Sequence, residues 1–145
     1  MTAPVVFTVR GHPKASPRPR ARSIQTKAGN HIASVYAGKT DKNWKQLVAA
    51  AARDAWGNRP VYQGPVEMSL MFYFIRPKSV SAAKRPQHTI RPDLDNLWKS
   101  VKDSLTGLVW KDDSQVIRGM VRKDYWNGSP DEAWTGAIVE VSFPC

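Results

Sequence analysis

The chain has 145 residues, with 22 Lys or Arg against 12 Asp or Glu, a net charge of +10 and a pI of about 10.1. This length fits one domain, and the hydrophobic content of 41% with six Trp excludes a chain disordered by composition. The one cysteine, Cys145, excludes an internal disulfide, and no apolar run could span a bilayer. We therefore expect a cytoplasmic protein that binds nucleic acid, with no membrane partner.

The first part of the chain predicts a strand, a basic arm and a helix. Residues 5–9 read as a short strand that ends at Gly11. Residues 11–38 hold five cations, several prolines and no acid, which indicates a basic arm or long hairpin with its turn at 27–30 and a return strand at 31–36. An apolar face that starts at Trp44 and includes Leu47 predicts a helix from a cap at Thr40 or Asp41 to about Trp56.

The second part predicts three strands and a second helix. Residues 66–75 alternate but are apolar on both sides, so we expect a central strand covered on much of both faces. A basic loop at 76–91 leads to a helix from about Asp95 to Leu105, and residues 115–125 and 137–143 read as a final pair of strands. This order predicts an α+β fold, a two-layer sandwich of a mixed or antiparallel sheet with two main helices, in a single domain over 1–145.

Half of the acids lie between residues 93 and 124, next to lysines. Asp93 and Asp95 flank the expected start of the second helix, and Lys99 follows Asp95 by one helical turn. With a third carboxylate from the Asp112–Asp113 turn, they could hold Mg²⁺, or Mn²⁺ in its place, for phosphodiester cleavage, while a lysine stabilises charge.

Each of these residues also has a structural explanation. Asp95 could simply cap the helix, and residues 111–114 could be an ordinary polar turn. Asp103 could be a surface partner of Lys99, and Trp98 and Trp110 could be packing residues. The cations expected to contact phosphates are Lys14, Arg18, Arg20, Arg22, Lys84, Arg85 and Arg91.

The segment Arg91-Pro-Asp-Leu-Asp-Asn-Leu-Trp-Lys99, followed by Trp110-Lys-Asp-Asp-Ser-Gln-Val116, closely resembles the signature of RusA-type Holliday-junction resolvases, in their phage and prophage branch. The resemblance covers most of the chain, with strong motifs from 91 to 116. It implies that Asp93, Asp95 and Asp113 bind the catalytic metal and that Lys99 is the catalytic lysine. It further implies a homodimer that nicks four-way DNA junctions symmetrically with Mg²⁺ or Mn²⁺, in a bacterial or phage-infected cell, without a small-molecule cofactor.

The leading hypothesis is therefore a metal-dependent, structure-selective endodeoxyribonuclease that resolves Holliday junctions. Two alternatives stay open at this point. One is a nuclease for another branched DNA or for single-stranded DNA. The other is a non-catalytic nucleic-acid-binding protein in which the carboxylates serve as caps and turns.

Overall fold

The computed structural model describes residues 2–17, 20–25, 27–29, 31–36, 41–128 and 133–144, with the backbone alone for 20–25 and 31–36. A four-stranded sheet forms the body, in the order β1 (Val5–Arg10), β6 (Gly136–Ser142), β4 (Val66–Phe74) and β5 (Val116–Tyr125). Strand β6 is antiparallel to both of its neighbours, whereas β4 and β5 are parallel, so the sheet is mixed.

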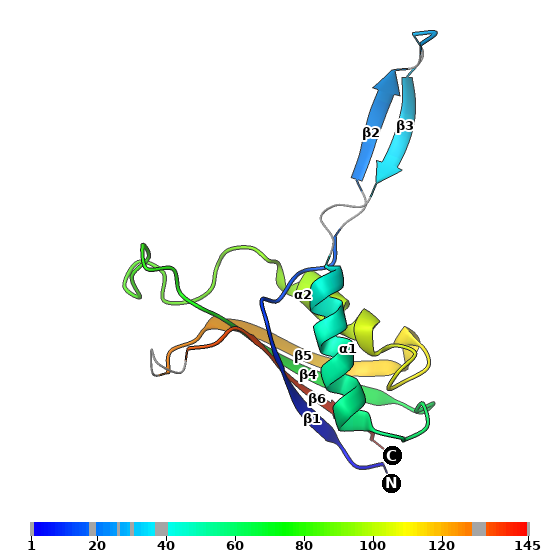
Figure 1. Ribbon diagram of the computed structural model, residues 1–145, viewed down its shortest axis with the longest axis vertical. Helices are drawn as coiled ribbons and strands as arrows, with labels where there is room; N and C mark the ends of the chain where they lie inside the picture. Colours follow the sequence, from blue (N-terminus) through cyan, green and yellow to red (C-terminus); the bar gives the residue numbers. More distant parts are fainter. Residues whose placement is uncertain are drawn as a thin grey trace.

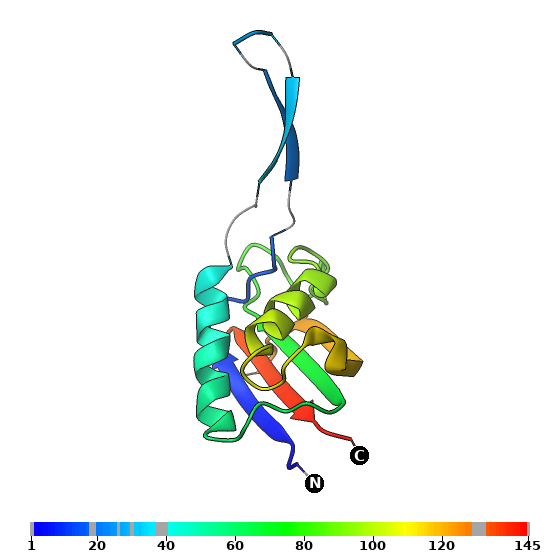
Figure 2. The same cartoon turned by 90° about the vertical axis from the view of Figure 1, so that its right-hand side faces the viewer.

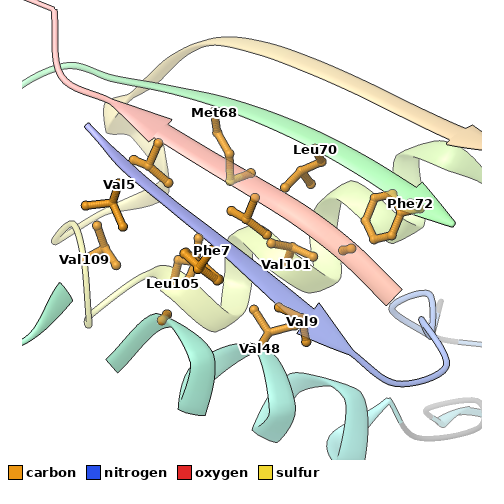
Figure 3. Close-up of a cluster of buried hydrophobic side chains, with 14 of the residues drawn as sticks. Val5, Phe7, Val9, Val48, Met68, Leu70, Phe72, Val101, Leu105 and Val109 are labelled. Carbon is orange, nitrogen blue, oxygen red and sulfur yellow. The ribbon is translucent and has the colours of Figure 1, made fainter. Parts of the chain in front are cut away.

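Two helices, α1 (Lys42–Trp56) and α2 (Leu94–Leu105), pack on one face of this sheet (Figures 1 and 2). Every second residue of β4 is buried beneath them, and Figure 3 shows the resulting core between the sheet and the helices. The indole Nε1 of Trp44 donates to Ser100 Oγ at 3.1 Å, so this buried polar contact between the two helices is satisfied. The α+β two-layer prediction is confirmed.

Three details of the prediction were wrong. The central position of β4 is confirmed, but the second face of the sheet is covered less than expected: no helix among the described elements packs there, Val6 and Met120 are exposed, and the outward residues of β4 are only half-buried. The last two strands are not neighbours, because β4 lies between β5 and β6. Leu47 is exposed rather than part of the buried face of α1, which consists of Trp44, Val48, Ala52 and Trp56.

The chain connects β4 to its parallel neighbour β5 through α2, because two parallel strands cannot be joined by a short hairpin. The loop of residues 75–93 therefore leaves the carboxyl end of β4 and delivers the start of α2 there. The short 3₁₀ helix η1 (Asp113–Gln115) lies at the other end of the connection, directly before the first residue of β5. This topology decides where each sequence motif lies.

A second, two-stranded sheet projects from the body at the end where α1 begins (Figures 1 and 2). Strands β2 (Arg20–Gln25) and β3 (His31–Tyr36) are antiparallel, with Arg20 opposite Tyr36, as expected for a long hairpin. Thr40, one of the two residues predicted to cap α1, lies outside the described residues, and Asp41 holds the N-cap position without a side-chain capping bond. None of the described helices has the length and apolar character to cross a membrane.

Candidate nuclease site

The start of α2 carries the first two predicted carboxylates. Asp93 is the N-cap residue, with φ −74° and ψ 145°, and Asp95 lies in the first turn. The side chain of Asp93 makes no capping hydrogen bond, and both residues are exposed. The N-cap position therefore belongs to Asp93 rather than Asp95, and Asp93 holds it without a side-chain capping bond. The backbone N–H groups at this helix end favour negative charge, which suits two carboxylates or a phosphate.

Lys99 lies one turn further along α2, and its side chain is 60% exposed. Its Nζ is 3.8 Å from Asp103 Oδ2, as the surface-pair alternative expected, and Asp103 is equally 3.8 Å from Lys45 Nζ of α1. An exposed pair of this length contributes little to stability. Lys99 thus has only a weak partner in Asp103, and its ammonium group stays accessible to an anionic ligand.

The root of the arm is fastened beside this site. The Ser16 amide donates to Asn96 O of α2 at 3.1 Å, and the Ser16 hydroxyl donates to Asp41 Oδ2 at 3.3 Å. Asp41 is buried and also pairs with Lys45 at 3.4 Å. The two chain segments that enter and leave the arm are therefore clamped together at the N-terminal end of α2, next to Asp95.

The turn at 111–115 gives its two aspartates different surroundings. Asp112 caps η1: its Oδ1 accepts from the backbone N–H of Ser114 at 2.8 Å and from the Ser114 hydroxyl at 2.7 Å, in a capping box completed by Gln115. The backbone N–H of Ser114, followed by its hydroxyl, lowers the pKa of the Asp112 carboxyl. Asp113 is half-buried and accepts a hydrogen bond from the Thr106 hydroxyl at the end of α2. Asp112 is therefore a structural cap, and Asp113 faces another side.

Within one copy of the chain, Asp113 lies far from the Asp93–Asp95 pair. Asp113 is bonded to Thr106, which follows Asp95 by 11 residues of helix, or about 16 Å at 1.5 Å per residue. A large separation also follows from β5, which starts beside η1 and reaches Pro92 through Lys123, roughly 23 Å along the strand. Across the described ranges, no three His, Cys, Asp or Glu side chains are grouped as a metal site.

The Asp93–Asp95 pair still fits a magnesium ion. Mg²⁺ keeps several of its waters in proteins and is commonly bound by one or two carboxylates together with substrate phosphates. Asp93 makes no capping bond that would occupy its oxygens, and both carboxylates are exposed at a helix end that a phosphate could approach. The donor set of one copy therefore matches a cation that is shared with a phosphate.

The loop before Asp93 is fastened by residues that the sequence did not single out. The Nζ of Lys123, on β5, donates to Ile90 O at 2.6 Å and to Pro92 O at 2.8 Å. Further back, the buried His88 ring stacks on Phe74 with ring centroids 4.2 Å apart and meets Tyr125 edge-on. Burial, with the charge of Lys123, lowers the pKa of His88, so the neutral ring is favoured. The only sequence signal for Lys123 was a lysine at an inward position of a strand, between Val121 and Tyr125.

The predicted phosphate-binding cations occupy two regions. Lys14 is exposed at the start of the arm, Arg18 lies outside the described residues, and only the backbone of Arg20 and Arg22 is described. On the loop after β4, Lys84 and Arg91 are exposed. Arg85 is half-buried, and its Nη1 donates to the Tyr125 hydroxyl at 3.3 Å, so this residue also anchors its own loop.

Trp98 and Trp110 are packing residues, as one alternative expected. Trp110 is fully buried, and its Nε1 donates to Thr106 Oγ1 at 3.0 Å. Trp98 lies over Gly119 of β5 so closely that a Cβ at that position would stand 2.3 Å from the indole. A side chain at position 119 would therefore force the Trp98 indole to move.

Comparison with known proteins identifies related sequences. A family profile described as "Endodeoxyribonuclease RusA" matches residues 10–132, from the end of β1 past the end of β5. The "Uncharacterized protein YqaN" of Bacillus subtilis (strain 168) is 37% identical over 130 residues, which is 83% of this chain and 87% of that protein. The family match spans the arm, the two helices and the turn at 111–115.

Proposed function

This chain belongs to the RusA endodeoxyribonuclease family, and we propose from this premise that it is a metal-dependent endonuclease that resolves Holliday junctions by paired symmetric nicks. One observation carries the proposal: Asp93, Asp95, Lys99 and the root of the basic arm all lie at the N-terminal end of α2. Carboxylates for a cation and cations for a DNA backbone thus meet at one end of the body. The cellular site proposed is the cytoplasm of a bacterial or phage-infected cell.

In this proposal Asp93 and Asp95 hold Mg²⁺, or Mn²⁺ in its place. The bound ion would lower the pKa of a coordinated water and neutralise charge on the phosphate that is cut. Lys99 places a positive charge one helical turn away, where it can stabilise negative charge that develops on that phosphate. Asp103 pairs with Lys99 at 3.8 Å on the surface of α2, so the ammonium group is not neutralised in a buried pair.

The position of Asp113 supports a homodimer. One copy cannot bring Asp113 to a cation held by Asp93 and Asp95, because ligands of one Mg²⁺ lie about 2 Å from the ion and Asp113 is roughly 16 Å away along α2. A two-fold partner whose α2 runs in the opposite sense would present its own Asp113 to this pair, and the reverse. Two composite sites related by a two-fold axis would suit a junction that is cut at two symmetric positions.

The arm and the loop after β4 supply the DNA-binding surface in this proposal. The cations Lys14, Arg18, Arg20 and Arg22 belong to the arm and its base, and Lys84, Arg85 and Arg91 to the loop. The two segments flank the start of α2 (Figure 1), so DNA that spans both would pass over Asp93 and Asp95. Contacts of this kind read the backbone and its path rather than its sequence, which is the requirement for selecting a branched structure.

One observation favours a second candidate function. The part of one copy that the structure describes holds no group of three metal-binding side chains, which is what a non-catalytic DNA-binding protein would also show. A nuclease for another branched DNA or for single-stranded DNA would use the same carboxylates on a different substrate. Both alternatives are separated from the proposal by experiment.

The test is cleavage of a mobile four-way junction by the purified protein, with and without Mg²⁺. The proposal expects nicks that appear only with Mg²⁺ or Mn²⁺ and that fall on opposing strands at the same position. Asp95→Asn should abolish cutting and leave junction binding without divalent ions intact or tighter. Binding without cutting by the unmodified protein would favour the non-catalytic alternative, and faster cutting of flap, fork or single-stranded substrates would favour another nuclease.

A further inference from the structure

The turn that presents Asp93 has little secondary structure of its own, and a lysine from the sheet holds it. Lys123 lies on β5, opposite Phe72 of β4, with its side chain on the face covered by the helices. Its Nζ donates to Ile90 O at 2.6 Å and to Pro92 O at 2.8 Å, so one ammonium group binds the carbonyls on both sides of Arg91. Pro92 directly precedes Asp93 in the chain.

A half-buried ammonium group needs hydrogen-bond acceptors, and Lys123 finds its acceptors in the backbone. Burial lowers the pKa of the Lys123 ammonium, while the nearby Asp93 charge opposes that effect. The hydrogen bonds of Lys123 go to two backbone carbonyls rather than to a carboxylate. Hydrogen bonds from a charged donor are roughly twice as strong as those between neutral groups, so Lys123 is a strong tether for a short segment.

We propose that Lys123 is a positioning residue of the nuclease site: it ties the turn 90–92 to β5 and thereby fixes Asp93 where it can share a metal ion with Asp95. This inference rests on the proposed function. It assigns Lys123 no contact with the substrate and no proton transfer. Its role is to hold the backbone from which a metal-binding carboxylate projects, as groups around a ligand commonly do in metal sites.

A purely electrostatic role for Lys123 predicts the opposite sign. The ammonium group carries a positive charge close to Asp93, and a fixed cation there opposes the binding of a second cation. If charge alone mattered, Lys123→Met would bind Mn²⁺ more tightly than the unmodified chain. If positioning matters, the same variant binds Mn²⁺ more weakly, because the carboxylate is no longer held beside its partner.

The experiment compares Lys123→Met, which keeps the length and removes the donors, with Lys123→Arg, which keeps a charged donor. Arg122→Met is the matched control, since it removes one exposed cation from the opposite face of β5. Mn²⁺ binding is followed by the free-ion signal in electron paramagnetic resonance, and backbone opening by hydrogen exchange of peptides covering 89–98. Single-turnover cleavage is measured as a function of Mg²⁺ concentration.

We expect Lys123→Met to weaken Mn²⁺ binding and raise the half-saturating Mg²⁺ concentration by about 10- to 100-fold, the range for loss of a residue that supports a metal ligand. Hydrogen exchange should accelerate in 89–98 but not in β1, and Lys123→Arg should restore most of the Mn²⁺ affinity. Unchanged or tighter Mn²⁺ binding by folded Lys123→Met overturns the proposal.

The same experiment separates this inference from the proposed function. If the unmodified chain neither cuts DNA nor binds Mn²⁺, the proposed nuclease fails, and the tether is then decided by hydrogen exchange alone. Unchanged exchange over 89–98 in Lys123→Met overturns the tether in that case, and faster exchange there supports it. If Lys123→Met fails to fold, Lys123→Arg decides. Unaltered Mn²⁺ binding and unaltered exchange over 89–98 support a charged tether, and weaker Mn²⁺ binding together with faster exchange there overturns it.

Discussion

The separation of Asp113 from Asp93 and Asp95 leads to a prediction about mixed dimers. Asp95→Asn and Asp113→Asn should each be inactive alone, because each lacks one carboxylate in both sites. In a heterodimer of the two variants, one composite site contains both lesions and the other contains neither, provided that Asp113 is supplied by the partner. Heterodimers should therefore recover one active site.

The magnitude follows from the distance and from simple counting. Asp95 and Thr106, which holds Asp113, are about 16 Å apart on one rigid helix, so the lesions cannot meet within one copy. Random mixing of equal amounts gives about half heterodimers, each with one good site of two, so about a quarter of all sites should be active. Heterodimers purified through two different tags should nick at about half the initial rate of the unmodified dimer.

The assay is a supercoiled plasmid that extrudes a cruciform. Paired cuts by the unmodified dimer linearise the plasmid, whereas a heterodimer with one site should yield nicked circles. The matched control is a mixture of Asp93→Asn with Asp95→Asn. It should stay inactive, because Asp93 and Asp95 come from the same copy and each of the two sites therefore carries one of the lesions. Tag-purified heterodimers of Asp95→Asn and Asp113→Asn that are as inactive as their parents would refute the shared site and return Asp113 to its own copy.

Three further outcomes are expected. Asp112→Ala should lower the urea midpoint of unfolding because it removes the cap of η1. Asp113→Asn should leave that midpoint unchanged and slow cleavage by at least ~100-fold. Slow cleavage by Asp112→Ala with normal cleavage by Asp113→Asn would contradict our placement of the third ligand. Replacing the four arm cations between residues 14 and 22 by Ala should reduce the salt slope of junction binding by about 0.9 for each phosphate that the arm no longer neutralises, and an unaltered slope would exclude the arm from the backbone interface. The pKa of His88 in the folded chain lies below its ordinary value of 6.5, so the unfolded chain binds the proton first and the free energy of unfolding should fall as pH drops below 6.5. Burial lowers the pKa of His12 in the same direction, so His88→Phe should make this pH dependence shallower, and parallel pH curves for the variant and the unmodified chain would contradict a contribution from His88.

The sequence predicted the local structure of this protein well. Alternation predicted the strand at 66–75, and helical spacing predicted the helices that start near Trp44 and Asp95. The prolines and cations of the arm predicted the hairpin. Local patterns could not place the last strand, because nothing in residues 137–143 indicates whether they pair with the preceding strand or insert between β1 and β4. The uncovered face of the sheet was missed for a related reason, since half-buried apolar residues on β4 resemble buried ones.

The same limit applies to the site. The family resemblance identifies candidate site residues, and helical spacing places Asp95 and Lys99 on one side of a helix. The position of η1, however, depends on contacts between residues that are distant in sequence. Gln115 Nε2 donates to Tyr62 O and Gly64 O, both at 2.9 Å, and so docks the turn at the start of β4. The role of Lys123 could not be predicted from the sequence for the same reason, because its contact with Pro92 requires the parallel register of β4 and β5.

In the proposed enzyme, the length of α2 would prevent a single copy from forming a complete site. A resolvase that made one nick and left would convert a junction into a broken duplex, so the two cuts have to be coupled. With Asp93 and Asp95 at one end of a 12-residue helix and Asp113 bound at the other, a single copy cannot assemble the three carboxylates around one ion. Under the proposed function, each site would exist only in the assembled pair, and both sites would form in the same event. Coupling of the two cuts would then follow from helix geometry alone, without a signal passed from one site to the other.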